Sequence, residues 1–466
     1  MKILFINIQL RPDSIRRQLP VGLAYIMTAT KKAGYGFDLY DMDINNYSVE
    51  DLKEYLKNNH YSIYAFGCIV TGYKKVKEIA QAIREENPFA IIVAGNSVAS
   101  SIPELLLRNT EVNYAVMGEG EETWIEFLKH IKHPWPALHG VNGLALHNGR
   151  GVVPRGWVNP FKRKPINNMN SIGFPDWDLF DLKKYNEYGR DNVNTFDDMQ
   201  VTSFPLNTAR GCLFDCHFCY HVFKGMKYRR YSIDKVIDEI DNLYLLYGCN
   251  YVCFWDELTF PNSLSAREFI KEFSKSTSVG DIKWDAVIRG DIFSKKDFSL
   301  LKDMKDLGCT GLAYSLESAD EEILNYMNKK LDLKKFREQT EIIYKAGLVP
   351  RTSVIFGFPQ ETIHTINKTI GMCRELNLFP SAGFLLPLPG TSIYDWCVDK
   401  KLIEDEVEYL ERIGDRQDLH INLTAMEDEE MVDLVRGGLE SLAEDQEIKV
   451  DDVFKTGTYK KPRKKK

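Results

Sequence analysis

The feature that most restricts the fold is a regular alternation of apolar and amphipathic segments over the first 125 residues. Five apolar runs predict buried strands: "KILFINI", "FDLYDMD", "YSIYAFGCIVTG", "FAIIVAG" and "YAVMGEGEE". Each is followed by a stretch with helical spacing, such as "VEDLKEYLKNN" or "YKKVKEIAQAIREEN". Such alternation produces a parallel sheet covered on both faces. We predict a flavodoxin-like, doubly wound α/β domain over residues 1–150, which binds ligands at the carboxyl ends of its strands.

A second alternation covers residues 199–400, with strands expected near "PLNTARG", "YVCFWDEL", "IKWDAVIR", "TGLAYSLES", "RTSVIFGFP" and "SAGFLLPLPG". Six strand–helix units predict a partial (β/α)6 barrel with its site at the strand carboxyl ends. Residues 151–198, where Pro, Asn and Asp are frequent, are expected to form a linker and surface loop. A hairpin with an Asn-Gly turn is expected within "GLALHNGRGVVP". Residues 401–466 are predicted to be an appended helical extension with a disordered basic tail.

Composition excludes several classes of protein. The 466 residues carry a net charge of -7, which argues against a dedicated nucleic-acid binder. No apolar run reaches the roughly 18 residues of a membrane helix. "MKILFINIQL" lacks the features of a signal peptide, so the nine cysteines are expected in the reducing cytoplasm, free or bound to metal.

Three of these cysteines lie within eight residues. "ARGCLFDCHFCYH" contains Cys212, Cys216 and Cys219 in the spacing C-x3-C-x2-C, just after the first predicted barrel strand. Three thiolates can hold three irons of a four-iron cluster and leave the fourth iron open. One alternative is structural zinc completed by His217 or His221. The other is chance crowding of free thiols.

This spacing, with aromatic Phe218 before the last cysteine, resembles the radical S-adenosylmethionine (SAM) family. The resemblance implies that the three cysteines hold a [4Fe-4S] cluster whose open iron is chelated by SAM. One electron then cleaves SAM to a 5'-deoxyadenosyl radical, which abstracts a hydrogen atom from the substrate. It also implies that the backbone around Phe218 and Tyr220 contacts adenine.

Further barrel segments resemble the same family. "FWDELTF" implies that Asp256 or Glu257 contacts the SAM amino group, and "WDAVIRGD" implies that Arg289 pairs with a carboxylate. "GLAYSLESADEEILNYMNK" implies that Glu317 and Ser318 lie near SAM. "VIFGFPQET" and "LPLPGTSIYD" resemble later family segments. Two structural alternatives compete: Asp256 caps a strand end, or Arg289 and Glu317 form an ion pair.

A flavodoxin-like domain before such a barrel resembles the cobalamin-binding subclass. "VAGNSVAS" and "YAVMGEGEETW" follow the fourth and fifth strands, where loops of relatives surround the corrin ring and the nucleotide tail. The implied cobalamin-binding residues are Thr71, Gly72, Gly95, Asn96, Ser97, Gly118, Glu119 and Gly120. The Asp-x-His-x-x-Gly loop that supplies a lower cobalt ligand elsewhere is absent. The alternative is a degenerate domain kept for packing or substrate binding.

The expected enzyme modifies an unactivated centre of a small-molecule, lipid or peptide substrate, by methyl transfer. An electron donor such as flavodoxin or ferredoxin is expected as a partner. The alternatives are radical cyclisation or rearrangement with the same cofactors, and a non-catalytic metal-binding protein. Methylthiotransferases normally carry further cysteines in the N-terminal domain. The N-terminal domain of this chain has Cys68 alone, which argues against that class of enzyme.

Overall fold

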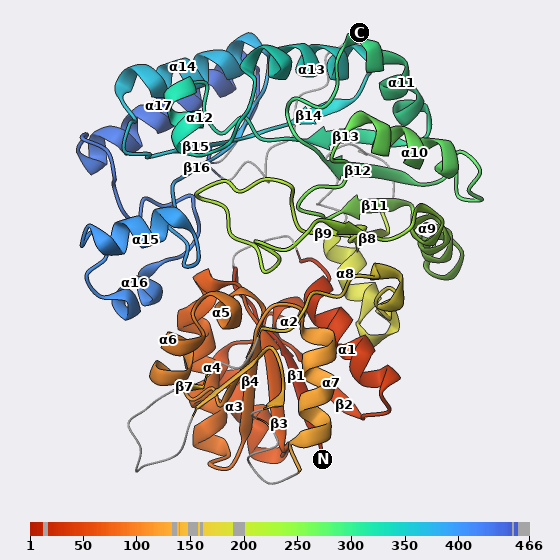
Figure 1. Ribbon diagram of the computed structural model, residues 1–466, viewed down its shortest axis with the longest axis vertical. Helices are drawn as coiled ribbons and strands as arrows, with labels where there is room; N and C mark the ends of the chain where they lie inside the picture. The colour runs from red at the N-terminus through yellow and green to blue at the C-terminus, as the bar shows by residue number, and fades with distance from the viewer. Residues whose placement is uncertain are drawn as a thin grey trace. The chain divides into compact units, whose positions relative to one another are not determined.

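The computed structural model describes residues 1–12, 17–132, 138, 140–147, 157–158, 162–189, 201–449 and 452–454. Contacts between Cα atoms divide the chain into two compact units. The first unit comprises Met1–Tyr188, Tyr220–Met226 and Leu388–Gly414, and the second comprises the remaining segments. Each unit contains a sheet of parallel strands flanked by helices (Figure 1).

The first unit contains a seven-stranded sheet in the order β2-β1-β3-β4-β5-β6-β7. The first five strands are parallel and confirm the predicted flavodoxin-like order. In the segment of the predicted hairpin, β6 forms and pairs antiparallel with β5, while the Asn-Gly turn lies outside the described residues. β7 lies beyond that segment and pairs antiparallel with β6. The strands are β1 (Ile3–Asn7), β2 (Phe37–Asp41), β3 (Ile63–Gly67), β4 (Ile91–Gly95), β5 (Tyr114–Val116), β6 (Leu144–His147) and β7 (Trp157–Val158).

Helices over residues 21–32, 49–58, 73–86, 103–109 and 120–130 form where amphipathic spacing predicts them, and three further short helices lie between them. At the helix that begins at Val49, the Ser48 hydroxyl and the Asp51 carboxylate form a reciprocal capping box. The helices are α1 (Val21–Lys32), α2 (Met42–Asn45), α3 (Val49–Asn58), η1 (Val70–Gly72), α4 (Tyr73–Glu86), α5 (Asn96–Ser101), α6 (Pro103–Asn109) and α7 (Gly120–His130).

The expectation of a loop over residues 151–198 is wrong for residues 162–189, which contain short helices of the first unit. These are η3 (Met169–Ser171), η4 (Trp177–Leu179) and α8 (Leu182–Gly189). The Tyr185 hydroxyl donates to Asp41 Oδ2 over 2.7 Å, and the Trp177 side chain is fully buried. These helices have at most two turns, too few for a visible period, and their tertiary contacts hold them in place.

The second unit contains the predicted barrel strands in two sheets. A five-stranded parallel sheet has the order β14-β13-β12-β11-β8, and β15 pairs in parallel with β16. Its strands are β8 (Ser203–Leu206), β11 (Tyr251–Phe254), β12 (Lys283–Val287), β13 (Cys309–Ala313), β14 (Val349–Arg351), β15 (Ser353–Phe356) and β16 (Ser381–Phe384). The fifth predicted strand is interrupted at Thr352, which divides the sheet and leaves the barrel open.

Helices connect the barrel strands. Aromatic side chains of one of them, α10, pack against Phe254 and Trp284 of the sheet. The helices are α9 (Ile233–Tyr247), α10 (Ser263–Phe273), η5 (Lys295–Asp297), α11 (Phe298–Asp306), α12 (Glu321–Tyr326), α13 (Leu333–Lys345) and α14 (Ile363–Glu375).

The chain after the barrel differs from the predicted boundary at residue 400. α15 (Ser392–Asp399) and α16 (Glu406–Arg412) group with the first unit, where Glu411 forms an ion pair with Lys77 of α4. The residues from Asp415 onward rejoin the second unit. The predicted boundary at residue 400 therefore does not separate the two units, because the chain passes from one to the other near residues 388 and 415.

The described part of the C-terminal segment belongs to the barrel rather than forming an appended cap. Phe384 N of β16 donates to Arg416 O over 2.6 Å, so this segment pairs with the outer edge of β16. α17 (Asp428–Asp445) packs against α14 and buries Met431 and Leu439. The expected basic tail lies outside the described residues.

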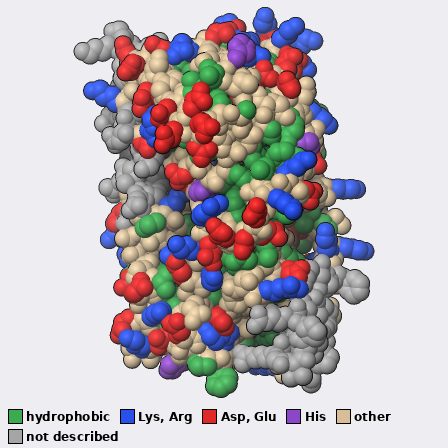
Figure 2. Space-filling model, turned by 90° about the vertical axis from the view of Figure 1, so that its left-hand side faces the viewer, with side chains coloured by type: hydrophobic (Ala, Val, Ile, Leu, Met, Phe, Trp, Pro, Cys, Tyr) green, Lys and Arg blue, Asp and Glu red, His purple; other side chains and the backbone are tan. Residues whose placement is uncertain are grey.

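The described helices include none with the length and apolar character needed to cross a membrane. On the face drawn in Figure 2, Lys and Arg side chains are interspersed with Asp and Glu side chains.

Candidate cofactor sites

The cysteine loop begins between two short strands of the second unit. β9 (Ala209–Arg210) pairs antiparallel with β10 (Arg229–Arg230), and Gly211 adopts a left-handed φ of 89° at the start of the loop. Cys216 is buried, Cys212 is half-buried and Cys219 is exposed. Cys219 N donates to Cys216 O over 3.2 Å, so a tight turn separates the last two cysteines.

Two carboxylates after β11 fix the start of this loop. Asp256 Oδ1 accepts from Thr208 N (2.7 Å) and Ala209 N (2.9 Å), and Oδ2 accepts from Thr208 Oγ1 (2.7 Å). Glu257 Oε2 accepts from Gly211 N at 3.3 Å. Burial raises the pKa of Asp256 to about 6 and that of Glu257 to about 7. Both oxygens of Asp256 are engaged, as its structural alternative requires, and the contact of either residue with SAM stays a prediction.

Arg289 is buried and contacts the cysteine loop directly. Its guanidinium carbon lies 3.7 Å from the centroid of the Phe214 ring, between Cys212 and Cys216. Arg289 Nη2 donates to Lys329 O at 2.7 Å and Lys330 O at 2.9 Å. The alternative of an ion pair between Arg289 and Glu317 is wrong, because Lys329 occupies that position.

Glu317 has a free oxygen in a buried environment. Lys329 Nζ donates to Glu317 Oε1 over 2.9 Å, while Oε2 is buried and accepts no hydrogen bond from the described residues. An unsatisfied buried acceptor costs roughly 1–3 kcal/mol. Glu317 also adopts a left-handed φ of 61°, which is unusual for a residue with a side chain. The free oxygen fits a cationic donor such as the amino group of SAM.

The same charged groups act on Cys216. Burial raises the pKa of the Cys216 thiol, and the positive charges of Lys329 and Arg289 oppose that rise. A thiolate is the form that binds iron, so nearby cations favour the ligating state. The loop therefore has the donor set and the charge environment that fit an iron–sulfur cluster.

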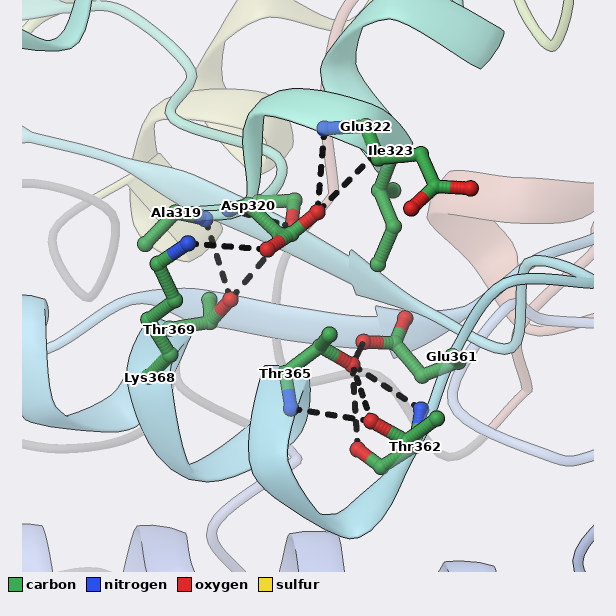
Figure 3. Close-up of polar contacts among 10 residues, drawn as sticks. Ala319, Asp320, Glu322, Ile323, Glu361, Thr362, Thr365, Lys368 and Thr369 are labelled. Carbon is green, nitrogen blue, oxygen red and sulfur yellow. Dashed lines mark hydrogen bonds and ion pairs between the residues drawn. The ribbon is translucent and has the colours of Figure 1, made fainter.

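The Ser318 side chain contacts Asp320 and Thr369. Its hydroxyl accepts from Asp320 N at 3.1 Å and lies 3.5 Å from Thr369 Oγ1. Figure 3 shows the surrounding contacts, in which Asp320 caps α12 and forms an ion pair with Lys368 of α14. These contacts hold α12 on α14, and a place for Ser318 near SAM stays a prediction.

In the "VIFGFPQET" segment, Glu361 bonds to the first turn of α14. Glu361 accepts from Thr365 Oγ1 at 2.7 Å (Figure 3) and from Gly357 N at 3.3 Å. Burial raises the pKa of Glu361 to about 7.

The two aromatic residues expected near adenine lie in different units. Phe218 packs edge-on against Phe358, with ring centroids 6.1 Å apart, in the second unit. Tyr220 belongs to the first unit, where its hydroxyl bonds with Ser101 and its ring lies against Gly390. A side chain at Gly390 would place its Cβ 2.6 Å from this ring. The sequence did not reveal this anchor, because its partners are distant along the chain.

The expected cobalamin residues lie after the carboxyl ends of β3, β4 and β5. Ser97 Oγ accepts from Val70 N at 2.8 Å and ties the first two of these loops together. Asn96 has a left-handed φ of 66°. Thr71 is half-buried on η1. A side chain at Gly72 would collide with Cys68 and Leu10, so packing alone requires that glycine.

The loop after β5 combines a glycine whose Cβ would lie 3.5 Å from the Met226 methyl group with two residues that make structural contacts. Gly118 has φ of 69° and donates through its N–H to Ser100 Oγ at 3.0 Å. Buried Glu119 accepts from Ile166 N at 2.8 Å, and Gly120 lies against the Ile26 side chain. Glu119 and Gly120 thus have structural contacts, and their cobalamin contacts stay predictions.

The same edge of the sheet exposes apolar surface. Ile69 after β3 is 43% exposed and Leu10 after β1 is 39% exposed. Gly67 and Gly95 end β3 and β4 without side chains. Glycines beside exposed apolar side chains allow a flat ring to approach the backbone closely, so this edge fits a corrin.

A zinc ion would need four ligands converging on one point. Among the described residues, no group of three His, Cys, Asp or Glu side chains is arranged to hold a single metal ion. A four-iron cluster distributes its ligands over separate irons, so this observation concerns a mononuclear site alone.

Residues 206–373 match the radical SAM superfamily, and residues 17–128 match the B12 binding domain. The chain contains a radical SAM domain and a B12-binding domain. Its cofactors are a [4Fe-4S] cluster, SAM and cobalamin, which confirms the cofactors expected from the sequence. The chain is therefore an enzyme, and the non-catalytic alternative is set aside.

Relatives of this radical SAM enzyme include an uncharacterized methyltransferase of Pyrococcus horikoshii, 26% identical over 86% of this chain and 85% of that protein. An anaerobic magnesium-protoporphyrin IX monomethyl ester cyclase of Cereibacter sphaeroides is 27% identical over 84% of this chain and 62% of that protein. The solved structure of the radical SAM methyltransferase TsrM from Kitasatospora setae has a TM-score of 0.66 at 18% identity, covering 85% of this chain and 76% of that chain. This likeness supports the fold.

Proposed function

We propose that this enzyme transfers a methyl group to an unactivated centre of a small-molecule, lipid or peptide substrate. The observation that carries the proposal is that one chain contains both a cysteine loop with Arg289 stacked on it and a B12-binding domain. A relative named as a methyltransferase, aligned over most of both chains, supports methyl transfer as the reaction.

Cys212, Cys216 and Cys219 are assigned as the cluster ligands. When bound, the cluster supplies the electron that cleaves SAM, and cobalamin carries the methyl group. Glu317 Oε2 receives the SAM ammonium, since it is buried beside a filled Oε1. Glu257 is a second candidate acceptor for that group; burial raises its pKa to about 7, and a bound cation would favour its charged form.

The experiment uses the iron-reconstituted, cobalamin-loaded protein under anaerobic conditions with dithionite and SAM labelled on its methyl group. Methyl transfer consumes one SAM as a methyl donor and another as a radical source. We expect both S-adenosylhomocysteine and 5'-deoxyadenosine, and with substrate a product heavier by one labelled methyl group. Formation of 5'-deoxyadenosine without S-adenosylhomocysteine would contradict methyl transfer.

That contrary result would favour the second candidate, radical cyclisation or rearrangement with the same cofactors. The similarity to the protoporphyrin ester cyclase supports this candidate. Absence of both products would contradict the cluster assignment itself.

We also assign the protein to the cytoplasm, with a flavodoxin-like or ferredoxin-like reductant. No disulfide joins any of the nine cysteines, which agrees with a reducing compartment. The mixed surface charge of Figure 2 and the net charge of -7 support a substrate other than nucleic acid.

A further inference from the structure

The middle of the cysteine loop is bonded to the segment at the end of α12. His217 N donates to Met327 O at 2.9 Å, and His217 Nδ1 lies 2.7 Å from Tyr326 O. A carbonyl oxygen accepts only, so Nδ1 carries the proton. Asn328 Nδ2 donates to Asp215 O at 2.7 Å. Residues on both sides of Cys216 are thus held by one segment, 326–330, which we call the clasp.

Arg289 fastens the clasp to the cysteine loop from a third element. Its Nη2 bonds to the carbonyls of Lys329 and Lys330, while its guanidinium lies on the Phe214 ring. A planar guanidinium can donate in its plane and stack with its face at the same time, which an ammonium cannot. Arg289 therefore connects β12, the clasp and the loop segment between Cys212 and Cys216.

The clasp maintains an unfavourable backbone shape. Asn328 has φ of 54° and Lys330 has φ of 50°, both left-handed. Asn tolerates this region, whereas it is sterically unfavourable for Lys. The bonds to Asp215, His217 and Arg289 offset that cost, so the clasp and the cysteine loop stabilise one another's shape.

We propose that the clasp and Arg289 preorganise the cysteine loop for cluster binding, acting as positioning residues for the three ligands. The inference rests on the proposed cluster assignment. Preorganisation would slow cluster loss, because an opened loop would have to break the bonds to Asp215 and His217 before its thiolates could leave the irons.

Asn328→Asp tests the clasp. Asp keeps the size of Asn and its tolerance of the left-handed region, but its carboxylate cannot donate to Asp215 O. Asn377→Asp is the matched control, since Asn377 has φ of 52° just after α14 and, among the described residues, no side-chain hydrogen bond to the cysteine loop. Both variants are reconstituted with iron and sulfide, and loss of the cluster absorbance to excess chelator is timed.

We expect Asn328→Asp to lose its cluster roughly three- to tenfold faster than the wild type, as removal of this one hydrogen bond predicts. Asn377→Asp should match the wild type, and thermal unfolding should be similar in both variants. The reduced-cluster EPR signal should also change in Asn328→Asp alone. Equal loss rates in all three proteins would overturn the proposal while leaving the cluster assignment intact.

Arg289→Lys provides a second variant that keeps the charge. Lys cannot stack on Phe214 and bond two carbonyls together, so we expect faster cluster loss here too. A wild-type rate in Arg289→Lys would overturn the role assigned to Arg289. Failure of the wild type to take up a cluster would overturn the cluster assignment, and the proposal with it.

Discussion

At the scale of single residues, the candidate cluster site is built from paired charges around one buried thiol. Lys329 and Glu317 form an ion pair, and Arg289 lies on the loop that contains Cys216. A buried ion pair gives little net stability, yet its members act strongly on neighbouring charge because the dielectric is low. Two predictions concern these residues.

Cys216→Ala should abolish both the cluster absorbance and SAM cleavage, because two cysteines cannot hold the cluster. Cys373→Ala is the control: Cys373 is fully buried on α14, so its loss should cost some stability and leave the cluster unchanged. The measurement is iron content and visible absorbance after anaerobic reconstitution. A Cys216→Ala protein that keeps a full cluster would refute the assignment.

Lys329→Met and Glu317→Gln should shift the cluster midpoint potential in opposite directions. Loss of the cation makes electron uptake harder and the potential more negative, whereas loss of the carboxylate makes it less negative. A redox titration followed by EPR, without SAM, measures both, and a tenfold change in the reduction equilibrium corresponds to 59 mV. Shifts of the same sign would show that these charges do not act on the cluster.

At the scale of elements, a turn in the first unit and a helix start in the second depend on single residues. Gly118 lies in the turn after β5 of the first unit, and Glu361 precedes α14 of the second. Both depend on local geometry that the motifs "GEGEE" and "GFPQE" suggested, although their partners did not follow from the motifs. A prediction belongs to each.

Gly118→Ala should weaken cobalamin retention. The left-handed φ penalises any side chain by roughly 1–2 kcal/mol, and the new Cβ would lie 3.5 Å from the methyl group of Met226. Gly248→Ala is the matched control, because Gly248 has φ of 64° at the end of α9. Titration with hydroxocobalamin followed by desalting should leave about one cobalamin per chain in the wild type and the control. Equal retention in Gly118→Ala would count against this loop as a cobalamin contact.

Glu361→Gln should reduce the pH dependence of stability between about pH 4.5 and 7. Burial raises the folded-state pKa of Glu361 to about 7, so the folded protein binds more protons and loses stability as pH rises through this window. The share from one such group is on the order of 3 kcal/mol. Thermal unfolding at pH 5 and pH 7 should differ less in the variant. An unchanged difference would show that Glu361 does not titrate there.

At the scale of the whole molecule, the chain returns to each unit after leaving it. Residues 220–226 and 388–414 belong to the first unit, and the segment from Asp415 covers the edge of β16 in the second. An uncovered strand edge pairs with other chains, so this cover protects the open barrel from aggregation.

A chain ending at Gly414 should therefore be insoluble. It would expose the edge of β16 and the face of α14 that α17 buries. Arg416→Ala is the control, because it removes the side chain but keeps the carbonyl that pairs with Phe384 N. The soluble fraction and light scattering measure the outcome. A soluble truncated protein with an intact cluster would show that the cover is dispensable.

The sequence by itself determined the fold class, the strand–helix order and the cofactor set, because periodicity and cysteine spacing are local signals. It also indicated Glu317 and Arg289 as site residues, and the structure excludes the ion pair between them that was the alternative. Only the tertiary structure decided that Lys329 neutralises Glu317, that Asn328 and His217 hold the cysteine loop, and that residues 162–189 fold as helices. Each of these depends on contacts between residues far apart in sequence, or on elements too short to show a period.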